Sequence, residues 1–144
     1  MNKTTKTVGA GVATIATIAL TATSASADNS IVKIKKYGEL SASHRIAWIG
    51  VKVTCSEDTT SAQLTATLTQ VTHGSVQSNT GQVTSLNAFE CTGEEEVVYV
   101  PVRRPTGGFA WVKGAARASN VSFVTADPSG TFTDTAKGRT IYLR

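Results

Sequence analysis

The chain has 144 residues, with 14 basic and 10 acidic side chains and a formal net charge of +4. Two of the basic residues, Lys3 and Lys6, lie in the N-terminal segment discussed next, so the rest of the chain carries only +2. This small charge, without a run of Lys and Arg that alternates with aromatic residues, argues against a nucleic-acid partner. The length suits one domain and is short for two.

The N-terminus has the three-part pattern of a secretory signal peptide. A polar stretch with Lys3 and Lys6 precedes an apolar segment over 8–20, and Ala25-Ser26-Ala27 provides the small residues of a cleavage site. The apolar segment is too short to cross a bilayer of about 30 Å as a helix. We therefore predict a cleaved, helical signal peptide over 1–27. The alternatives are a retained membrane anchor or a buried helix.

Cleavage after Ala27 would leave residues 28–144 as a single, secreted, extracellular domain. No cysteine lies near the cleavage point to carry a lipid, and the C-terminus has no hydrophobic tail. We expect no membrane span after cleavage, and a monomer.

The two cysteines, Cys55 and Cys91, are predicted to form a disulfide, because export places them in an oxidising compartment. The alternative is a pair of free thiols that bind a metal or act in redox chemistry. The sequence has no CxxC motif and no histidine near either cysteine, which favours the disulfide.

From residue 28 onward, apolar residues recur with the period of two that is typical of β-strands. The first strand is expected over 31–36, and the clearest over 46–55. A third is expected over 62–70, with an apolar face and a threonine-rich face exposed to water. The residues predicted to face the core from these two longer strands are Ala47, Ile49, Val51, Val53, Cys55, Ala62, Leu64, Ala66 and Leu68.

Four more strands follow along the chain. The strand over 98–102 is predicted at a sheet edge, because Pro101 cannot donate to a ladder of hydrogen bonds. The segment 109–118 alternates large and small residues, and we expect its small face to point inward. Short strands are expected over 121–124 and 139–143. Turns are expected at Tyr37-Gly38, His73-Gly74, Thr92-Gly93, Thr106-Gly107-Gly108 and Asp127-Pro128-Ser129-Gly130.

Seven or eight short strands, frequent turns and no helix after residue 27 predict an all-β, single-domain, immunoglobulin-like β-sandwich with one disulfide. In antibody domains a tryptophan lies between the two cysteines. Here Trp48 precedes Cys55 and Trp111 follows Cys91, so this hallmark is absent and the strand order stays open.

Four short segments resemble a family of small exported actinobacterial proteins of unknown function. They are Val51-Lys52-Val53-Thr54-Cys55, Leu68-Thr69-Gln70, Cys91-Thr92-Gly93, and Phe109 leading to Gly114-Ala115-Ala116. The resemblance implies a bacterial protein with the immunoglobulin-like sandwich fold, and it implies no activity. The expected architecture is also similar to that of the secreted apoproteins that carry enediyne chromophores, which use two disulfides where this chain has cysteines for one.

No catalytic set, metal-ligand spacing or nucleotide-binding loop is recognisable. The two histidines, His44 and His73, lie in segments that resemble solvated loops, and the residues around them do not single out either one as catalytic. We therefore expect a protein that is not an enzyme and has no cofactor and no metal site.

Acidic residues flank both cysteines, and a disulfide would gather them near one end of the domain. Such a cluster could hold a calcium ion or a cationic partner, but the spacing of a calcium loop is absent, and a solvated acidic end is the favoured interpretation. These residues are Glu57, Asp58, Glu90, Glu94, Glu95 and Glu96.

Basic residues gather in other segments: Lys33, Lys35 and Lys36, then Arg103 and Arg104, then Lys137 and Arg139. Lysines on a terminal strand protect a sheet edge from aggregation, and this explanation is favoured over binding of anionic wall polymers. Phe109 and Trp111 could form an exposed aromatic patch for a sugar or protein, but packing in the core is the favoured interpretation.

The predicted function is a secreted, non-enzymatic binding or interaction module for an extracellular protein or a cell-wall polymer. One alternative is a small-molecule carrier with a cleft between the sheets, where Gly114 and neighbouring alanines leave room. Another is a protease inhibitor that presents Arg103-Arg104-Pro105-Thr106 as a rigid loop. The last is a secreted enzyme that depends on His44 and His73.

Overall fold

The computed structural model describes residues 32–72 and 74–144. Every strand reported below belongs to the unit Ile31–Arg144. The predicted signal peptide and His73 lie outside the described residues. Among those described, the fold is all-β with one short 3-10 helix, and no helix has the length and apolar character needed to span a membrane.

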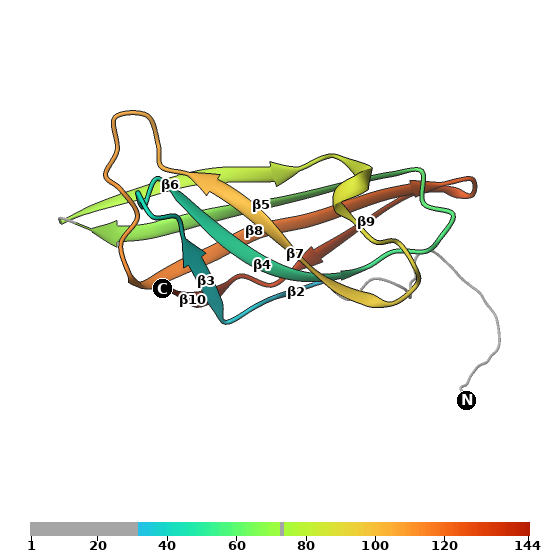
Figure 1. The fold of residues 1–144 in the computed structure, drawn as a ribbon, viewed down its shortest axis with the longest axis horizontal. Helices are drawn as coiled ribbons and strands as arrows, with labels where there is room; N and C mark the ends of the chain where they lie inside the picture. Colours follow the sequence, from blue (N-terminus) through green and yellow to red (C-terminus); the bar gives the residue numbers. More distant parts are fainter. Residues whose placement is uncertain (1–31, 73) are drawn as a thin grey trace. The chain divides into compact units, whose positions relative to one another are not determined.

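The described strands form one nine-stranded hydrogen-bonded sheet (Figure 1). Their bounds are β2 Lys33–Ile34, β3 Tyr37–Leu40, β4 Ile46–Thr54, β5 Ser61–Thr72, β6 Ser75–Val83, β7 Glu95–Arg103, β8 Gly114–Asp127, β9 Gly130–Ala136 and β10 Arg139–Leu143, with the 3-10 helix η1 at Leu86–Ala88.

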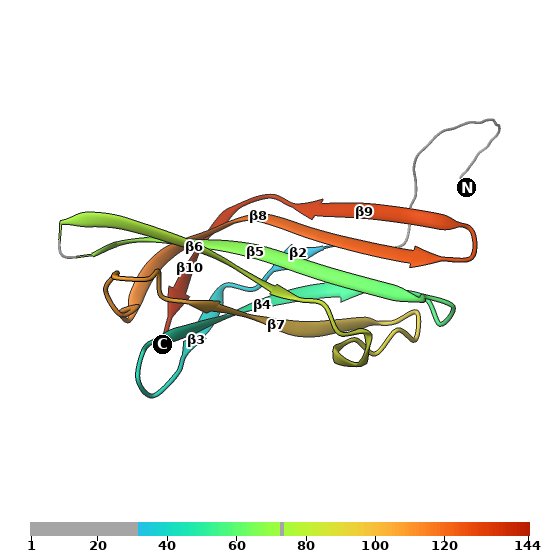
Figure 2. The ribbon, with the colours of Figure 1, turned by 90° about the horizontal axis from the view of Figure 1, so that it is seen from above.

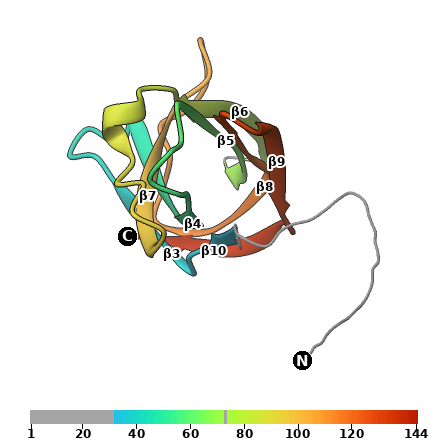
Figure 3. The same ribbon diagram turned by 90° about the vertical axis from the view of Figure 1, so that its right-hand side faces the viewer.

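Two sets of strands face each other across the core. β4 pairs with β7 along its whole length and with β2 and β3 on its other side, whereas β5 lies between β6 and β8. Figures 2 and 3 show β4 and β7 on one side of the core and β5, β6 and β8 on the other. A parallel pairing of β3 with β10 joins the two sets, because β10 also pairs with β8.

The alternation in β4 and β5 builds this core as expected. All nine residues predicted to face inward from these strands are buried, and the threonines between them face outward. The core also contains Trp111, Phe123 and Ile141, which are fully buried, and the rings of Phe89 and Phe123 lie 5.4 Å apart. A period of two thus identified the buried face where that face is apolar.

The predicted edge position of β7 is confirmed, because among the described strands β7 pairs with β4 alone. On its open side β7 passes close to β6. A Cβ on Gly81 would lie 2.0 Å from the carbonyl oxygen of Pro101, so only glycine permits this approach.

The expected strand over 109–118 is wrong in its first half. Residues 109–113 form part of a loop, and β8 begins at Gly114 and runs on through the separate strand that we expected over 121–124. Its small inward residues, Ala116 and Ala118, are buried as predicted. Near Asn120, whose φ of 51° is left-handed, β8 has one residue more than the facing part of β5, which makes a β-bulge. On its other edge, β8 pairs with β10 before this bulge and with β9 after it.

Three strands were not predicted. β6 and β9 lack an apolar alternation, and Tyr37-Gly38 was expected to be a turn but lies in β3. A Cβ on Gly38 would lie 2.8 Å from Leu143 Cδ2 and 2.9 Å from the Trp48 carbonyl oxygen. Gly38 therefore serves the close passage of β3 between β4 and β10 rather than a turn.

The Cys55–Cys91 disulfide is confirmed. Cys55 follows β4 directly, and Cys91 precedes β7 by a few residues, so the bond continues the side-by-side course of two paired strands. The chain between the cysteines leaves this pair to form β5, β6 and η1 and then returns. The disulfide therefore closes the whole excursion.

The expected turn at 127–130 joins β8 to β9, and Asp127 Oδ1 accepts hydrogen bonds from the Ser129 hydroxyl (2.6 Å) and backbone N–H (2.7 Å). The hydrogen bond from the Ser129 side chain, and then that from its backbone, lowers the pKa of Asp127 from its usual value.

A carboxyl whose pKa is lower in the folded than in the unfolded chain stabilises the fold above about pH 4, and this contribution disappears as the pH falls through the folded pKa. We expect Asp127→Asn to unfold at lower urea than the wild type at neutral pH, and the gap between their midpoints to narrow on acidification. Urea titrations of both proteins at neutral and at acidic pH measure the two gaps. A gap that widens in acid would contradict the assignment.

Candidate functional site

A basic groove of about 430 Å³ lies beside β2, where the lysines on and just after this strand meet the connection between β9 and β10. Six cationic side chains line it: Lys33, Lys35, Lys36, Lys52, Lys137 and Arg139. More than 100 residues of sequence separate its two ends. The structure thus brings together two of the basic clusters that the sequence shows far apart.

Strand pairing places these cations. Lys33 on β2 is the register partner of Lys52 on β4, which puts two ammonium-bearing side chains side by side. Arg139 begins β10, and its Nη1 donates to the Ile34 carbonyl oxygen at 3.0 Å, which ties β10 to β2 across the groove. Because Arg139 makes this link, it has a structural as well as an electrostatic role.

The lining of the groove contains no Asp or Glu side chain among the described residues. Lys52 lies 3.9 Å from Glu95 Oε1, but both side chains are about half exposed, so this ion pair contributes little. The groove therefore combines like charges with an apolar floor that includes Val32 and Ile34. An anion bound there would relieve the mutual repulsion of these cations.

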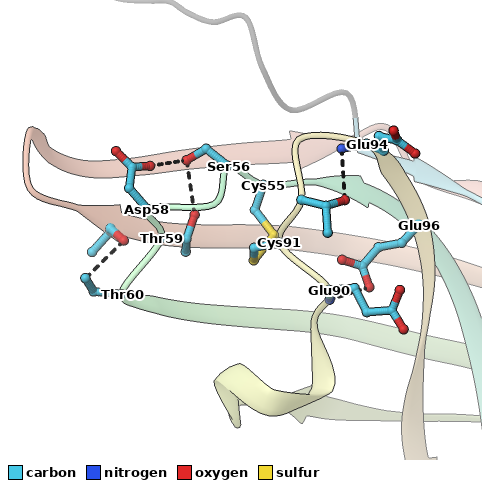
Figure 4. Close-up of a disulfide and its surroundings, with 11 residues drawn as sticks. Cys55, Ser56, Asp58, Thr59, Thr60, Glu90, Cys91, Glu94 and Glu96 are labelled. Atoms are coloured by element: carbon cyan, nitrogen blue, oxygen red, sulfur yellow. Dashed lines mark hydrogen bonds between the residues drawn. A yellow bond between two sulfur atoms is a disulfide. The ribbon is translucent and has the colours of Figure 1, made fainter.

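The acidic residues lie on the flanks of the disulfide, but their carboxylates do not converge. Figure 4 shows Asp58 beside Ser56 on one side of the sulfur atoms, and Glu90, Glu94 and Glu96 on the other. Within residues 32–72 and 74–144, no three His, Cys, Asp or Glu side chains could hold one metal ion. The arrangement is that of carboxylates spread around an exposed end.

Glu96 differs from the other glutamates. Its Oε1 accepts a hydrogen bond from the Glu90 backbone N–H at 2.9 Å, and its Oε2 is buried without a hydrogen-bond partner (Figure 4). This side chain braces the segment that leads into Cys91, because it fixes the backbone of the residue just before that cysteine.

The long loop between β7 and β8 is fastened to the domain by two buried glutamines. Gln77 donates to the Phe109 carbonyl oxygen (2.7 Å) and accepts from the Phe109 N–H (2.8 Å). Gln70 makes the same pair of bonds with Val112, at 2.8 and 3.0 Å. Each side-chain amide pairs with the loop backbone as a neighbouring strand would.

Sequence reasoning did not identify either glutamine as a residue that holds this loop. A signal was present for Gln70, because it continues the inward alternation of β5 with a polar side chain.

Trp111 is the anchor of the same loop. It is fully buried, its indole N–H donates to the Val102 carbonyl oxygen at 3.0 Å, and its backbone N–H donates to the His44 carbonyl oxygen at 2.9 Å. Phe109 is 46% exposed. The aromatic pair therefore divides: Trp111 belongs to the core, and only Phe109 lies at the surface.

The dibasic segment is held at its backbone. The Arg103 carbonyl oxygen accepts from Asn79 Nδ2 at 2.9 Å, and the Arg104 N–H donates to the Arg45 carbonyl oxygen at 2.8 Å. Both groups of the peptide bond between the two arginines are thus engaged within the domain. A second, smaller depression of about 320 Å³ lies beside these three arginines.

Of two residues invoked for the alternative functions, Gly114 lies elsewhere than expected and His44 lies in a loop before β4, as expected. Gly114, which we expected beside an internal cleft, is exposed at the start of β8 with a φ of 124°, while Ala116 and Ala118 pack in the core. His44 occupies the turn between β3 and β4 in a left-handed conformation, and its carbonyl oxygen receives the Trp111 N–H.

Comparisons with protein-family models, with curated proteins and with solved structures found no match for this chain. The resemblance to small exported actinobacterial proteins therefore stays a prediction.

Proposed function

We propose that the protein is a secreted, non-enzymatic binding module that holds an anionic extracellular polymer in the basic groove. The observation that carries this proposal is the convergence of Lys33, Lys35 and Lys36 with Lys137 and Arg139 around one depression. The disulfide is compatible with an extracellular protein.

Edge protection explains lysines along a terminal strand, but it does not require them to meet a second basic cluster from the other end of the chain. A polymer with regularly spaced negative charges would contact several of these cations at once and release its condensed counterions, so its affinity should fall steeply with salt. A cell-wall polymer rich in phosphate or carboxylate has this chemistry.

The finer architecture belongs to the same proposal: an immunoglobulin-like β-sandwich. Supporting it are the pairings of β4 with β7, of β8 with β5 and β10, and of β5 with β6, which match the B–E, F–C, F–G and C–C′ pairs of the variable-type immunoglobulin domain. In this arrangement the groove lies at the first and last strands, away from the loops at either end.

The test uses protein harvested from the culture medium, which should begin at Asp28, and a long-chain linear polyphosphate as the probe. We expect the double variant Lys33→Gln/Lys137→Gln to weaken binding about tenfold or more and to reduce the slope of log affinity against log salt by about two. Fluorescence anisotropy of labelled polyphosphate over a salt series measures both quantities.

The matched control is Arg45→Gln/Arg103→Gln, which also removes two positive charges, but beside the second depression. It should change the affinity by less than the groove variant does. If the control loses as much affinity as the groove variant, only net charge matters. If the control loses more, the binding site lies at the arginines. If the wild type does not bind polyphosphate, the proposal is overturned.

A further inference from the structure

The outward faces of the two sets of strands differ in chemistry. On β5 and β6, hydroxyls and amides pair across the strands, as in Thr67 with Thr80 (2.7 Å) and Thr69 with Ser78 (3.0 Å). On β4 and β7, which face the viewer in Figure 1, the outward positions include Trp48 and Tyr99 instead. The outer face of β5 and β6 is polar except for Val71 and Val76, which pair near the end of the hairpin. The fold therefore does not require aromatic residues on an outer face, and those on β4 and β7 call for another explanation.

Tyr99 lies at the centre of this face and is 44% exposed. Its register partner is Gly50, and a Cβ on Gly50 would lie 3.2 Å from Tyr99 Cε1 and 3.1 Å from Lys35 Cδ. The tyrosine ring and the lysine stem therefore both lie over this glycine, as neighbours. Since Lys35 also lines the basic groove, the aromatic face and the groove are continuous.

Tyr37 and Tyr142 extend the aromatic surface onto β3 and β10, with ring centroids 6.4 Å apart. The Arg144 guanidinium carbon lies 4.3 Å from the centre of the Tyr37 ring and covers one of its faces. Lys36 Nζ, which also lines the groove, lies 5.4 Å from the centre of the same ring, so Tyr37 is already occupied by two cations. Among the described residues no such cation lies over Tyr99, which leaves this ring open to a ligand that also reaches the groove.

We propose that the ligand is an anionic polysaccharide, with its carboxylates in the basic groove and a sugar ring stacked on Tyr99. This inference rests on the proposed function and names its substrate class. The C–H bonds on one face of a pyranose ring form an apolar patch that matches an aromatic ring, while its hydroxyls stay in water. A polyphosphate supplies the charges without the rings, so only a glycan uses both parts of the surface.

The test compares two polymers on one set of variants: polygalacturonate, which has sugar rings and carboxylates, and linear polyphosphate, which has charge alone. We expect Tyr99→Ala to weaken polygalacturonate binding about tenfold and to change polyphosphate binding by less than about twofold. Tyr99→Phe keeps the ring and should retain most of the affinity. Phe109→Ala, which removes a comparably exposed ring from the β7–β8 loop, should have no effect on either polymer.

Each outcome decides between the two proposals. Loss of polygalacturonate binding in both Tyr99→Ala and the groove variant supports the inference. Equal weakening of both polymers by Tyr99→Ala, or no weakening of either, overturns it while the groove stands. If the wild type binds neither polymer, both proposals fall. Circular dichroism of Tyr99→Phe and Tyr99→Ala shows whether a loss reflects unfolding.

Discussion

Removal of the Cys55–Cys91 disulfide is expected to lower the free energy of unfolding by about 4 kcal/mol. The bond joins residues 36 apart, and in the chain-entropy model a cross-link of this span stabilises mainly by restricting the unfolded chain. A domain of this size is typically stable by about 5 to 15 kcal/mol, so the loss would be a large fraction of the total.

The position of the bond in the fold supports an effect of this size. It closes the segment that leaves β4, forms the β5–β6 hairpin across the core, and returns as β7. Without the bond, the pairing of β4 with β7 must itself offset the entropy of closing that loop.

Guanidinium titrations of the wild type and of Cys55→Ala/Cys91→Ala, followed by circular dichroism, measure the difference. Alanine is preferred to serine because Cys55 is 4% exposed, and a hydroxyl would bring an unsatisfied polar group into the core. The wild type with its disulfide reduced is the second reference and should agree with the double variant. A difference below about 1 kcal/mol between the free energies of unfolding would contradict the explanation by loop closure, because the bond would then contribute little to stability.

Trp111→Ala is expected to cost about 3 to 5 kcal/mol, because it empties a fully buried position under the β7–β8 loop. The same change removes the indole donor of the Val102 carbonyl oxygen. Trp111→Phe keeps most of the buried area and loses this donor, so we expect a smaller cost, about 1 to 3 kcal/mol.

The control for this pair is Phe109→Ala, two residues away in the same loop, where the side chain is 46% exposed and the expected cost is below about 1 kcal/mol. Denaturant unfolding at one pH compares all three variants with the wild type. If Phe109→Ala were as destabilising as Trp111→Ala, the anchor of the loop would have been assigned to the wrong aromatic residue.

Prediction from the sequence succeeded where one strand face is apolar and the other is not. β4 and β5 satisfy this condition, and their apolar inward residues were identified, whereas the buried polar residues Gln70 and Thr72 at the end of β5 were not. It failed for β6, whose inward face includes Gln77 and Gly81, because a polar strand gives no hydrophobic period. Gln77 is buried because it takes the place of a backbone partner for Phe109, which no local pattern encodes.

The loop that contains Trp111 shows a second reason for failure. Alternation over 109–118 indicated a strand, but residues 109–113 are held by side-chain amides instead of a neighbouring strand. Whether an alternating segment becomes a strand depends on a partner edge, and partners are chosen by the whole fold.

The amino-acid sequence by itself determined the all-β class, the disulfide between Cys55 and Cys91 and the edge position of β7, because strand periodicity, cysteine number and the missing N–H of proline are local properties. Only the tertiary structure decided that Lys33 and Lys137 line one groove, that this groove is continuous with Tyr99, and that of the two loop aromatics Trp111 is buried while Phe109 is exposed. Such neighbourhoods arise from pairings between segments far apart in the chain, and a one-dimensional pattern does not contain them.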